Sequence, residues 1–333
     1  MLSNTCLYNI CMVTHAQILC NTFKEQAIEI AKQIDIAYQT GLGVHEESLS
    51  DLLVNRIQIG HTENFLSKKF TKKEEGNLTG ADWLWCIGEP GSWITFDVQA
   101  KIMNPKTGNV NYLHYRHGEQ YNLLINFCKQ FRFIPKYSVY GKLEEDATFF
   151  SREMPELRNV PLAEWSFSMV SPKYIKDLVS PEERYISSVL QFSIPWSYLF
   201  CIPAMNPISL ADGIAHNLEN LYWIFDRKYR NQRSQKDRDK FSRINWENPL
   251  PSAMVTKDVP LVVLYLLCSE RHIRKVPISN VSIYSTLPVQ RVLDHELKKI
   301  DGQRRWKTFP GLFERAISRI QECKTIYMLP DGR

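Results

Sequence analysis

The sequence predicts an α/β protein in which a mixed sheet lies between helices. Two observations support this fold class. Segments with helical periodicity and segments with strand composition alternate within the first 140 residues. They follow one another as helices, a hairpin, a helix and a strand, an order that places a sheet between helical layers. The expected helices are residues 23–38, 46–57 and 118–131, and the expected strands are residues 79–87, 93–102 and 137–140.

Each expected helix before the hairpin carries an apolar stripe on one face. In the first helix, the stripe consists of Phe23, Ala27, Ile30, Ile34 and Ala37. In the second helix, it consists of Leu49, Leu52, Leu53 and Ile57. Glu47 and Asp51 lie one turn apart on a more polar side of the second helix. Both helices are therefore expected to pack on the sheet through one face.

The hairpin is the centre of the predicted fold. Aromatic and β-branched residues fill both strands, and turn-forming residues occupy positions 88–92. The second strand alternates, so that its apolar residues point into a core and its polar residues point the other way. Folding the hairpin about Pro90 places Asp82 opposite about residue 98, with Asp97 and Gln99 as diagonal neighbours.

One face of the predicted hairpin therefore gathers Asp82, Asp97, Gln99 and Lys101. Carboxylate and amide oxygens are the ligands that a hard cation such as Mg²⁺ prefers. A lysine beside them can orient a water molecule or neutralise the charge that develops on a phosphate. These residue types in this arrangement are what metal-assisted cleavage of a phosphodiester requires.

An aspartate, a hairpin and then Gln99-Ala100-Lys101 resemble the core of the PD-(D/E)XK nuclease superfamily. The sequence is most similar to the Mrr-like branch, in which glutamine replaces the second acid. The Gly-Ala-Asp-Trp and Val-Gln-Ala-Lys sequences also resemble uncharacterised bacterial proteins associated with phage defence. The resemblance covers about residues 40–140, with a further similar segment at 195–201. It implies a restriction-endonuclease-like core, followed here by a C-terminal α/β extension.

The resemblance implies a nuclease that depends on Mg²⁺ or Mn²⁺. The expected metal ligands are Asp82, Glu47, the Gln99 side chain and the Ala100 carbonyl. Lys101 is expected to assist the attacking water, which makes Asp82, Gln99, Lys101 and Glu47 the expected catalytic set. Glu46 is the alternative to Glu47 for the helix acid.

Two further residues are candidates for supporting this site. Asp97 shares the strand face with Gln99, and it can restore the charge that glutamine lacks. Gln120 lies in the first turn of the helix after the hairpin, where a glutamine faces the site in several branches of the superfamily. The alternative for Gln120 is an ordinary exposed helix residue.

Two basic stretches are candidates for binding nucleic-acid phosphates. The first is the charged connection at residues 67–76, and the second is the basic stretch at 226–246. The second contains Arg227, Lys228, Arg230, Arg233 and Lys236. The alternative for both is a solvated surface. We place the nuclease core within residues 1–140 and leave open whether residues 141–333 continue its sheet or form a second domain.

Composition fits a globular protein without a membrane segment. The chain of 333 residues has a net charge of +5, which permits a nucleic-acid partner without requiring one. Its eight cysteines form no metal-binding pattern, and we expect them to be reduced in a cytoplasmic protein. Polar residues interrupt the start of the chain, so that no signal peptide is expected there.

Two functions remain open from the sequence. The first is a metal-dependent endonuclease that acts on nucleic acid, with DNA favoured over RNA, in bacterial defence against phage. The second is a module that keeps the nuclease fold without turnover and binds nucleic acid or a partner protein. A homo-oligomer and a partner protein from a defence system are both compatible with either function.

Overall fold

The computed structural model describes residues 4–61, 63–104, 107–110, 119–143, 155, 157–178, 186–191, 193–201, 209–232, 250–260 and 262–263. The chain divides into two compact units, residues 1–256 and residues 257–333. Most of the second unit lies outside the described residues, and the fold below is that of the first unit.

Six strands of the described part form one mixed sheet in the order β1-β2-β3-β4-β5-β6. They are β1 (Phe65–Lys69), β2 (Trp83–Glu89), β3 (Ser92–Ile102), β4 (Ile134–Tyr140), β5 (Phe167–Val170) and β6 (Ile194–Pro195). Strands β3 and β4 are parallel, and the other neighbours are antiparallel. Because parallel neighbours need a crossover, a helix connects β3 to β4. The α/β class with a mixed sheet flanked by helices is confirmed.

The α-helices are α1 (Asn4–Thr40), α2 (Glu46–Gly60), α3 (Lys72–Glu74), α4 (Glu119–Phe131), α5 (Pro172–Leu178), α6 (Ile186–Leu190), α7 (Tyr198–Cys201) and α8 (Leu210–Gln232). The π-helical turn η1 (Glu75–Thr79) follows α3, and the 3₁₀ turns are η4 (Leu162–Ser166) and η5 (Pro251–Met254). Within the described residues, no helix combines the length and apolar character needed to cross a membrane.

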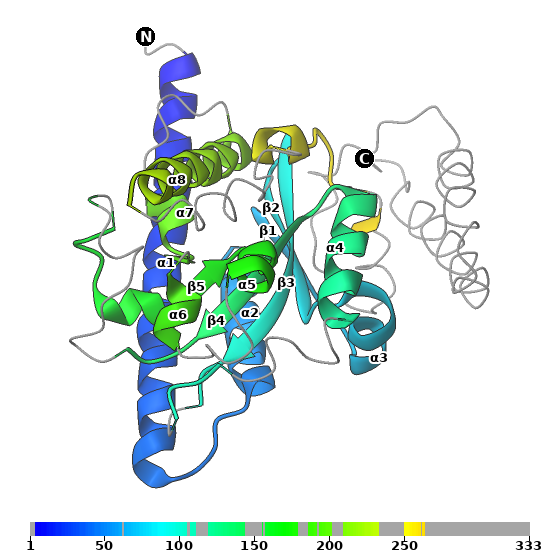
Figure 1. Ribbon diagram of the computed structural model, residues 1–333. Helices are drawn as coiled ribbons and strands as arrows, with labels where there is room; N and C mark the ends of the chain where they lie inside the picture. Colours follow the sequence, from blue (N-terminus) through cyan, green and yellow to red (C-terminus); the bar gives the residue numbers. More distant parts are fainter. Residues whose placement is uncertain are drawn as a thin grey trace, which may run out of the picture. The chain divides into compact units, whose positions relative to one another are not determined.

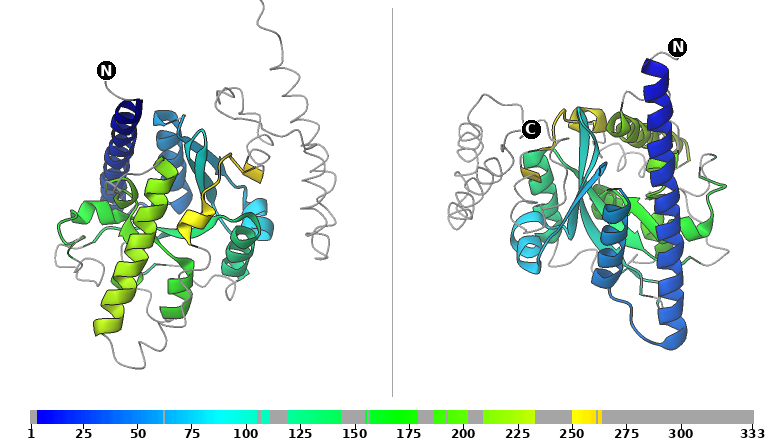
Figure 2. Two further views of the ribbon diagram at one scale, coloured as in Figure 1. Left: turned by 90° about the horizontal axis from the view of Figure 1, so that it is seen from above. Right: turned by 180° about the vertical axis from the view of Figure 1, so that it is seen from behind.

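Helices cover both faces of the sheet (Figure 1). On one face, the ring of Phe23 from α1 packs against Trp85, Phe167 and Trp196, and all four side chains are fully buried. Aromatic pairs of this kind contribute about 0.5–1.5 kcal/mol each beyond the area that they bury. Helix α4 lies on the opposite side of the sheet from α1 (Figure 2), where the Cys128 thiol approaches Asp97.

The polar face of β3 is therefore buried as deeply as its apolar face. Thr95, Asp97, Gln99 and Lys101 are each less than 5% exposed. Strand alternation correctly predicts which residues share a face, but α4 determines that this face is shielded from bulk water. Trp83 and Trp85 are fully buried on the other face, as core residues.

The hairpin register differs by one residue from the register that the sequence predicts. Glu89 pairs with Ser92, so the turn consists only of Pro90 and Gly91, with Gly91 at φ 95°. Trp83 consequently pairs with Val98, and Asp82, the residue just before β2, is joined to Gln99 by a side-chain hydrogen bond. Because strand side chains alternate between faces, the predicted pairing with residue 98 would have placed Asp82 on the apolar face.

Several segment assignments need correction. Residues 65–69 form strand β1, although their lysines make them resemble part of a charged connection. The apolar composition of residues 195–201 predicts a strand, whereas only Ile194–Pro195 form strand β6 and Tyr198–Cys201 form helix α7. The sequence left open whether the sheet continues beyond residue 140, and it does, because β5 pairs with β4 and β6 pairs with β5. Leu52, expected in the core, is an exposed residue of α2.

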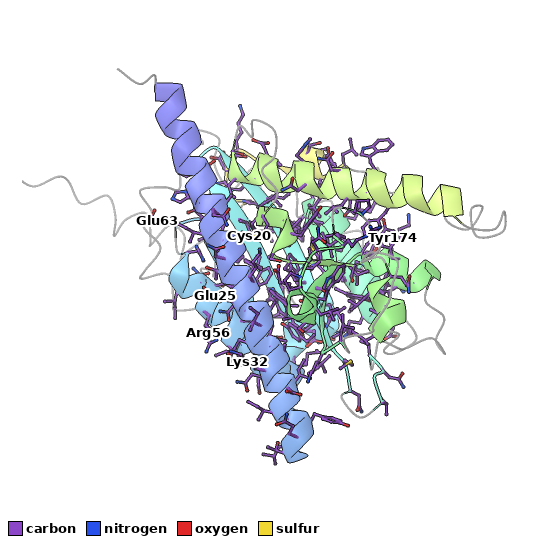
Figure 3. All side chains as sticks on the ribbon, turned by 90° about the vertical axis from the view of Figure 1, so that its left-hand side faces the viewer. Cys20, Glu25, Lys32, Arg56, Glu63 and Tyr174 are labelled. Carbon is purple, nitrogen blue, oxygen red and sulfur yellow. A yellow bond between two sulfur atoms is a disulfide. The ribbon has the colours of Figure 1, made fainter. Side chains whose placement is uncertain are left out.

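A disulfide connects Cys20 of α1 to Cys201 of α7, across 181 residues of the chain. The expectation that the cysteines are reduced is therefore wrong for this pair. Cys20 lies near the middle of α1, whose opposite side carries the exposed Glu25 and Lys32 (Figure 3). Cys86 and Cys128 are buried free thiols. The disulfide fastens α1 and α7 together over the aromatic face of the sheet.

Candidate active site at the open end of the hairpin

Asp82 is held in place by the main chain and by β3. Its amide N–H donates to the Val98 carbonyl over 2.8 Å, and its own carbonyl accepts from the Phe70 N–H over 2.8 Å. The carboxylate accepts hydrogen bonds from the Ala100 N–H at 2.7 Å and from the Gln99 amide nitrogen. Burial raises the pKa of this carboxyl group to about 6, and the positive charge of Lys101 opposes that increase.

The side-chain oxygen of Gln99 is buried and has no hydrogen-bond donor among the described residues. The Gln99 Nε2 donates to Asp82, and the same nitrogen lies 3.4 Å from the Ala100 carbonyl oxygen. Its Oε1 has no hydrogen-bond partner among the described residues, although the residue is only 1% exposed. A buried acceptor without a partner is costly, typically about 1–3 kcal/mol. This oxygen is therefore available to a cation or another donor.

The helix acid beside Asp82 is Glu46 rather than Glu47. Burial raises the pKa of Glu46 to about 8, with Lys101 lowering it and Asp82 raising it further. The Glu46 carboxyl group therefore interacts electrostatically with both Lys101 and Asp82. The Glu47 side chain is 56% exposed and lies 2.6 Å from Lys72, whose hydrogen bond lowers its pKa.

The helix period explains why the choice of Glu47 needs this correction. Successive residues on a helix point about 100° apart, so only one of two adjacent glutamates can face the sheet. Glu46 lies one turn before the buried Ser50, whose hydroxyl donates to the Glu46 carbonyl and lies 3.1 Å from the Tyr140 hydroxyl. Glu47 lies one turn before Asp51, which forms an ion pair with Lys69 at the surface.

Lys101 approaches the site from β3 and is 4% exposed. Its Nζ donates to Gln120 Oε1 at 3.3 Å, so that Gln120 does face the site, from the first turn of α4. The Gln120 Nε2 donates in turn to Glu75 at 2.7 Å. Lys72 lies 3.2 Å from the second oxygen of Glu75. Lys101 is thus the first member of a polar chain that leaves the sheet.

Asp97 lies in the interior between the sheet and α4. It is fully buried, and its Oδ2 accepts a weak hydrogen bond from the Cys128 thiol at 3.8 Å. Burial raises the pKa of Asp97 well above its usual value, and the charge of Asp82 raises it further. The structure therefore places Asp97 on the same face as Asp82, in surroundings that disfavour its charged form.

The basic stretch is described only in part. Arg227, Lys228 and Arg230 belong to the last turns of α8. Arg233 and Lys236 lie outside the described residues. The other basic stretch contributes to the site itself, because Lys72 connects Glu47 to Glu75.

Glu75 and Lys72 are residues at this site that sequence reasoning missed. Both lie in a charged segment that resembles a solvated connection. The available signal was local: Thr71 and Glu74 form a capping box that starts a helical turn immediately after β1. That turn brings Glu75 back toward α4.

The fold and this cluster define an α/β protein with a buried carboxylate, amide and lysine at the open end of a central hairpin. The donors are two carboxylates with amide and carbonyl oxygens, and no set of three acidic, histidine or cysteine side chains forms a metal-binding group in the described ranges. The chain belongs to a family of unknown function (DUF6615), whose model matches residues 19–305. No curated protein matches this chain.

Proposed function

We propose that this protein is a metal-dependent nuclease of the PD-(D/E)XK type that hydrolyses phosphodiester bonds, with DNA as the preferred substrate. One observation carries the proposal: Asp82, Gln99 and Lys101 meet on a single buried face, joined by a hydrogen bond from Gln99 to Asp82. Glu46, from α2, completes a set of two acids, an amide and a lysine. The one-residue change in register supports the proposal, because it aligns Asp82 with Gln99 directly.

The residues present fit a hard dication such as Mg²⁺ or Mn²⁺. The carboxyl groups of Asp82 and Glu46 have raised pKa values, and Asp82 raises that of Glu46, so that a bound cation would relieve their repulsion. The Gln99 Oε1, which has no hydrogen-bond partner in the described part of the chain, would provide a neutral ligand. Asp82, Glu46, Gln99 and the Ala100 carbonyl would hold the metal. When bound, such an ion supplies positive charge to the phosphate and lowers the pKa of a coordinated water.

Lys101 would assist the attacking water and the phosphate. Its ammonium group is buried beside Asp82 and Glu46, and Gln120 fixes its direction. In this position it can orient the attacking water and stabilise the additional negative charge on the phosphate. Water is largely excluded from the polar face of β3, so that these electrostatic interactions are stronger than they would be at the surface.

Cleavage of supercoiled plasmid tests the proposal directly. The protein is incubated with plasmid in Mg²⁺, in Mn²⁺ or in EDTA, and nicked and linear products are quantified. Asp82→Ala should abolish the metal-dependent products, while the control Asp51→Ala should retain them, because Asp51 is an exposed surface partner of Lys69. Undiminished cleavage by Asp82→Ala would overturn the assignment of this site.

The second candidate function is a nuclease-fold module that binds nucleic acid or a partner protein without turnover. The glutamine at position 99 favours it, because the site then has one negative charge fewer than the usual pattern provides. DNA binding without cleavage by the parent protein, in either metal, would support this candidate.

The proposal also includes the cellular role and compartment of the protein. Bacterial defence against phage follows from the resemblance, and a cytoplasmic location was inferred from the scattered cysteines. The Cys20–Cys201 disulfide is more typical of an oxidising compartment. Thiol alkylation during lysis of the native host, followed by mass spectrometry, would determine the state of this pair.

A further inference from the structure

Glu75 is a mostly buried carboxylate that has no role in the proposed mechanism. It is the first residue of η1, between β1 and β2, and its side chain is 13% exposed. One of its oxygens accepts from the Gln120 amide at 2.7 Å, and the other lies 3.2 Å from Lys72. The other end of the same Gln120 amide accepts from Lys101. A continuous hydrogen-bonded chain therefore connects Glu75 to the lysine of the site.

The chemistry of the two ends fixes the orientation of the amide between them. A lysine ammonium only donates, and a carboxylate paired with a cation only accepts. Gln120 must therefore direct its oxygen toward Lys101 and its nitrogen toward Glu75. If Glu75 were replaced by a neutral amide, the Gln120 side chain could rotate by 180° without losing its partner, and it would then present a donor to Lys101.

The backbone keeps the two ends of this chain in position. Gly80 ends η1 with φ 68°, and a Cβ atom there would lie 2.4 Å from the Gln120 carbonyl oxygen and 2.5 Å from the Leu124 nitrogen. The turn and α4 are thus in direct main-chain contact. This contact holds residue 75 opposite residue 120, independently of the side chains.

We propose that Glu75 is a positioning residue that acts through Gln120 to direct the Lys101 ammonium toward Asp82. Its effect on cleavage rests on the proposed nuclease function, whereas its effect on Lys101 does not. The Lys72–Glu75 ion pair has a separate role: it holds the Glu75 side chain and connects it to Glu47 on α2. Glu75 is expected to control how well Lys101 is placed and not how tightly substrate binds.

Three variants separate these roles. Glu75→Gln allows the Gln120 amide to rotate. The exchange variant Glu75→Gln/Gln120→Glu gives Lys101 a carboxylate acceptor again and keeps the total charge, but it leaves Lys72 without its partner at position 75. The control Glu119→Gln removes one negative charge from an exposed residue next to Gln120 in α4.

Two measurements are made on each protein. The first is the ammonium signal of Lys101 in lysine-selective ¹⁵N NMR of the metal-free protein, assigned by its loss in Lys101→Met. The second is the dependence of plasmid cleavage on substrate concentration in Mg²⁺. Hydrogen bonds to charged groups contribute enough for loss of one to change kcat by about tenfold.

We expect Glu75→Gln to broaden or remove the Lys101 signal and to lower kcat about tenfold with little change in KM. The exchange variant should restore both, and Glu119→Gln should change neither. An unchanged Lys101 signal in Glu75→Gln would overturn the proposal, as would an exchange variant as impaired as Glu75→Gln, which would assign the effect to the Lys72 ion pair. If no protein cleaves DNA but Glu75→Gln still loses the signal, the positioning role stands and the proposed nuclease function fails.

Discussion

The raised pKa of Glu46 makes the stability of the metal-free protein depend on pH in a specific way. Burial raises this pKa from 4.5 in the unfolded chain to about 8 in the folded protein. Below pH 4.5 the group is protonated in both states. Between pH 4.5 and 8 the folded state binds the proton more tightly, so that stability falls as the pH rises through this window.

The substitution Glu46→Gln removes this penalty, because glutamine has nearly the same shape and stays neutral. A pKa raised from 4.5 to about 8 corresponds to about 5 kcal/mol of lost stability above pH 8. Relaxation around the charged form reduces the expected gain to about 2–4 kcal/mol. Near pH 5 the variant and the parent protein should be almost equally stable.

Urea unfolding in EDTA at pH 5, 7 and 8.5 measures the effect. The control is Glu47→Gln, which should cause only a small loss at pH 7, because Lys72 lowers the pKa of Glu47 at an exposed position. Addition of Mg²⁺ at pH 7 should stabilise the parent and leave Glu46→Gln nearly unchanged. A difference in stability between Glu46→Gln and the parent that stays constant from pH 5 to pH 8.5 would show that Glu46 does not have the raised pKa.

Three further predictions concern residues around the site and the disulfide. Gln99→Glu should lower the Mg²⁺ concentration for half-maximal cleavage, since it adds a charged ligand, whereas Gln99→Leu should be nearly inactive; equal cleavage by Gln99→Leu would exclude Gln99 as a ligand. Gly80→Ala should destabilise the protein by more than about 2 kcal/mol in urea unfolding, because its Cβ would meet the α4 main chain at a positive φ. Cys201→Ser should lower the free energy of unfolding by about 3–5 kcal/mol under oxidising conditions, because the disulfide closes a loop of 181 residues. In dithiothreitol the variant and the reduced parent should be almost equally stable, and unfolding midpoints in both conditions measure this.

The site residues on the hairpin could be predicted because their arrangement is local. A strand has a period of two, so Asp97, Gln99 and Lys101 must share a face wherever β3 lies. A hairpin brings its two strands together without any help from the rest of the chain. The register of the hairpin was not predicted correctly, because the turn consists of Pro90 and Gly91 alone, whereas a loop of five residues was expected. Turn length changes register by single residues, and composition alone does not define it.

Residues from other segments could not be placed in this way. Helical periodicity shows that Glu46 and Glu47 point in different directions, but the rotation of α2 on the sheet decides which of them faces Asp82. Lys68 belongs to a lysine-rich segment, yet it is 2% exposed in β1. Glu75 reaches Gln120 across 45 residues of sequence. Each of these contacts depends on packing between elements that are distant in the chain.

The α/β class, the hairpin and the shared face of Asp97, Gln99 and Lys101 follow from the sequence alone, whereas the two-residue turn determines that Asp82 joins this face. These features follow from backbone periods and turn chemistry, which act over a few residues. Packing between distant elements determines that α4 buries this face, that Glu46 interacts with Asp82 and Lys101, that Glu75 is connected to Lys101, and that Cys20 meets Cys201. Those outcomes depend on how the apolar faces of separate elements pack, and packing is determined by the whole core and not by any one segment.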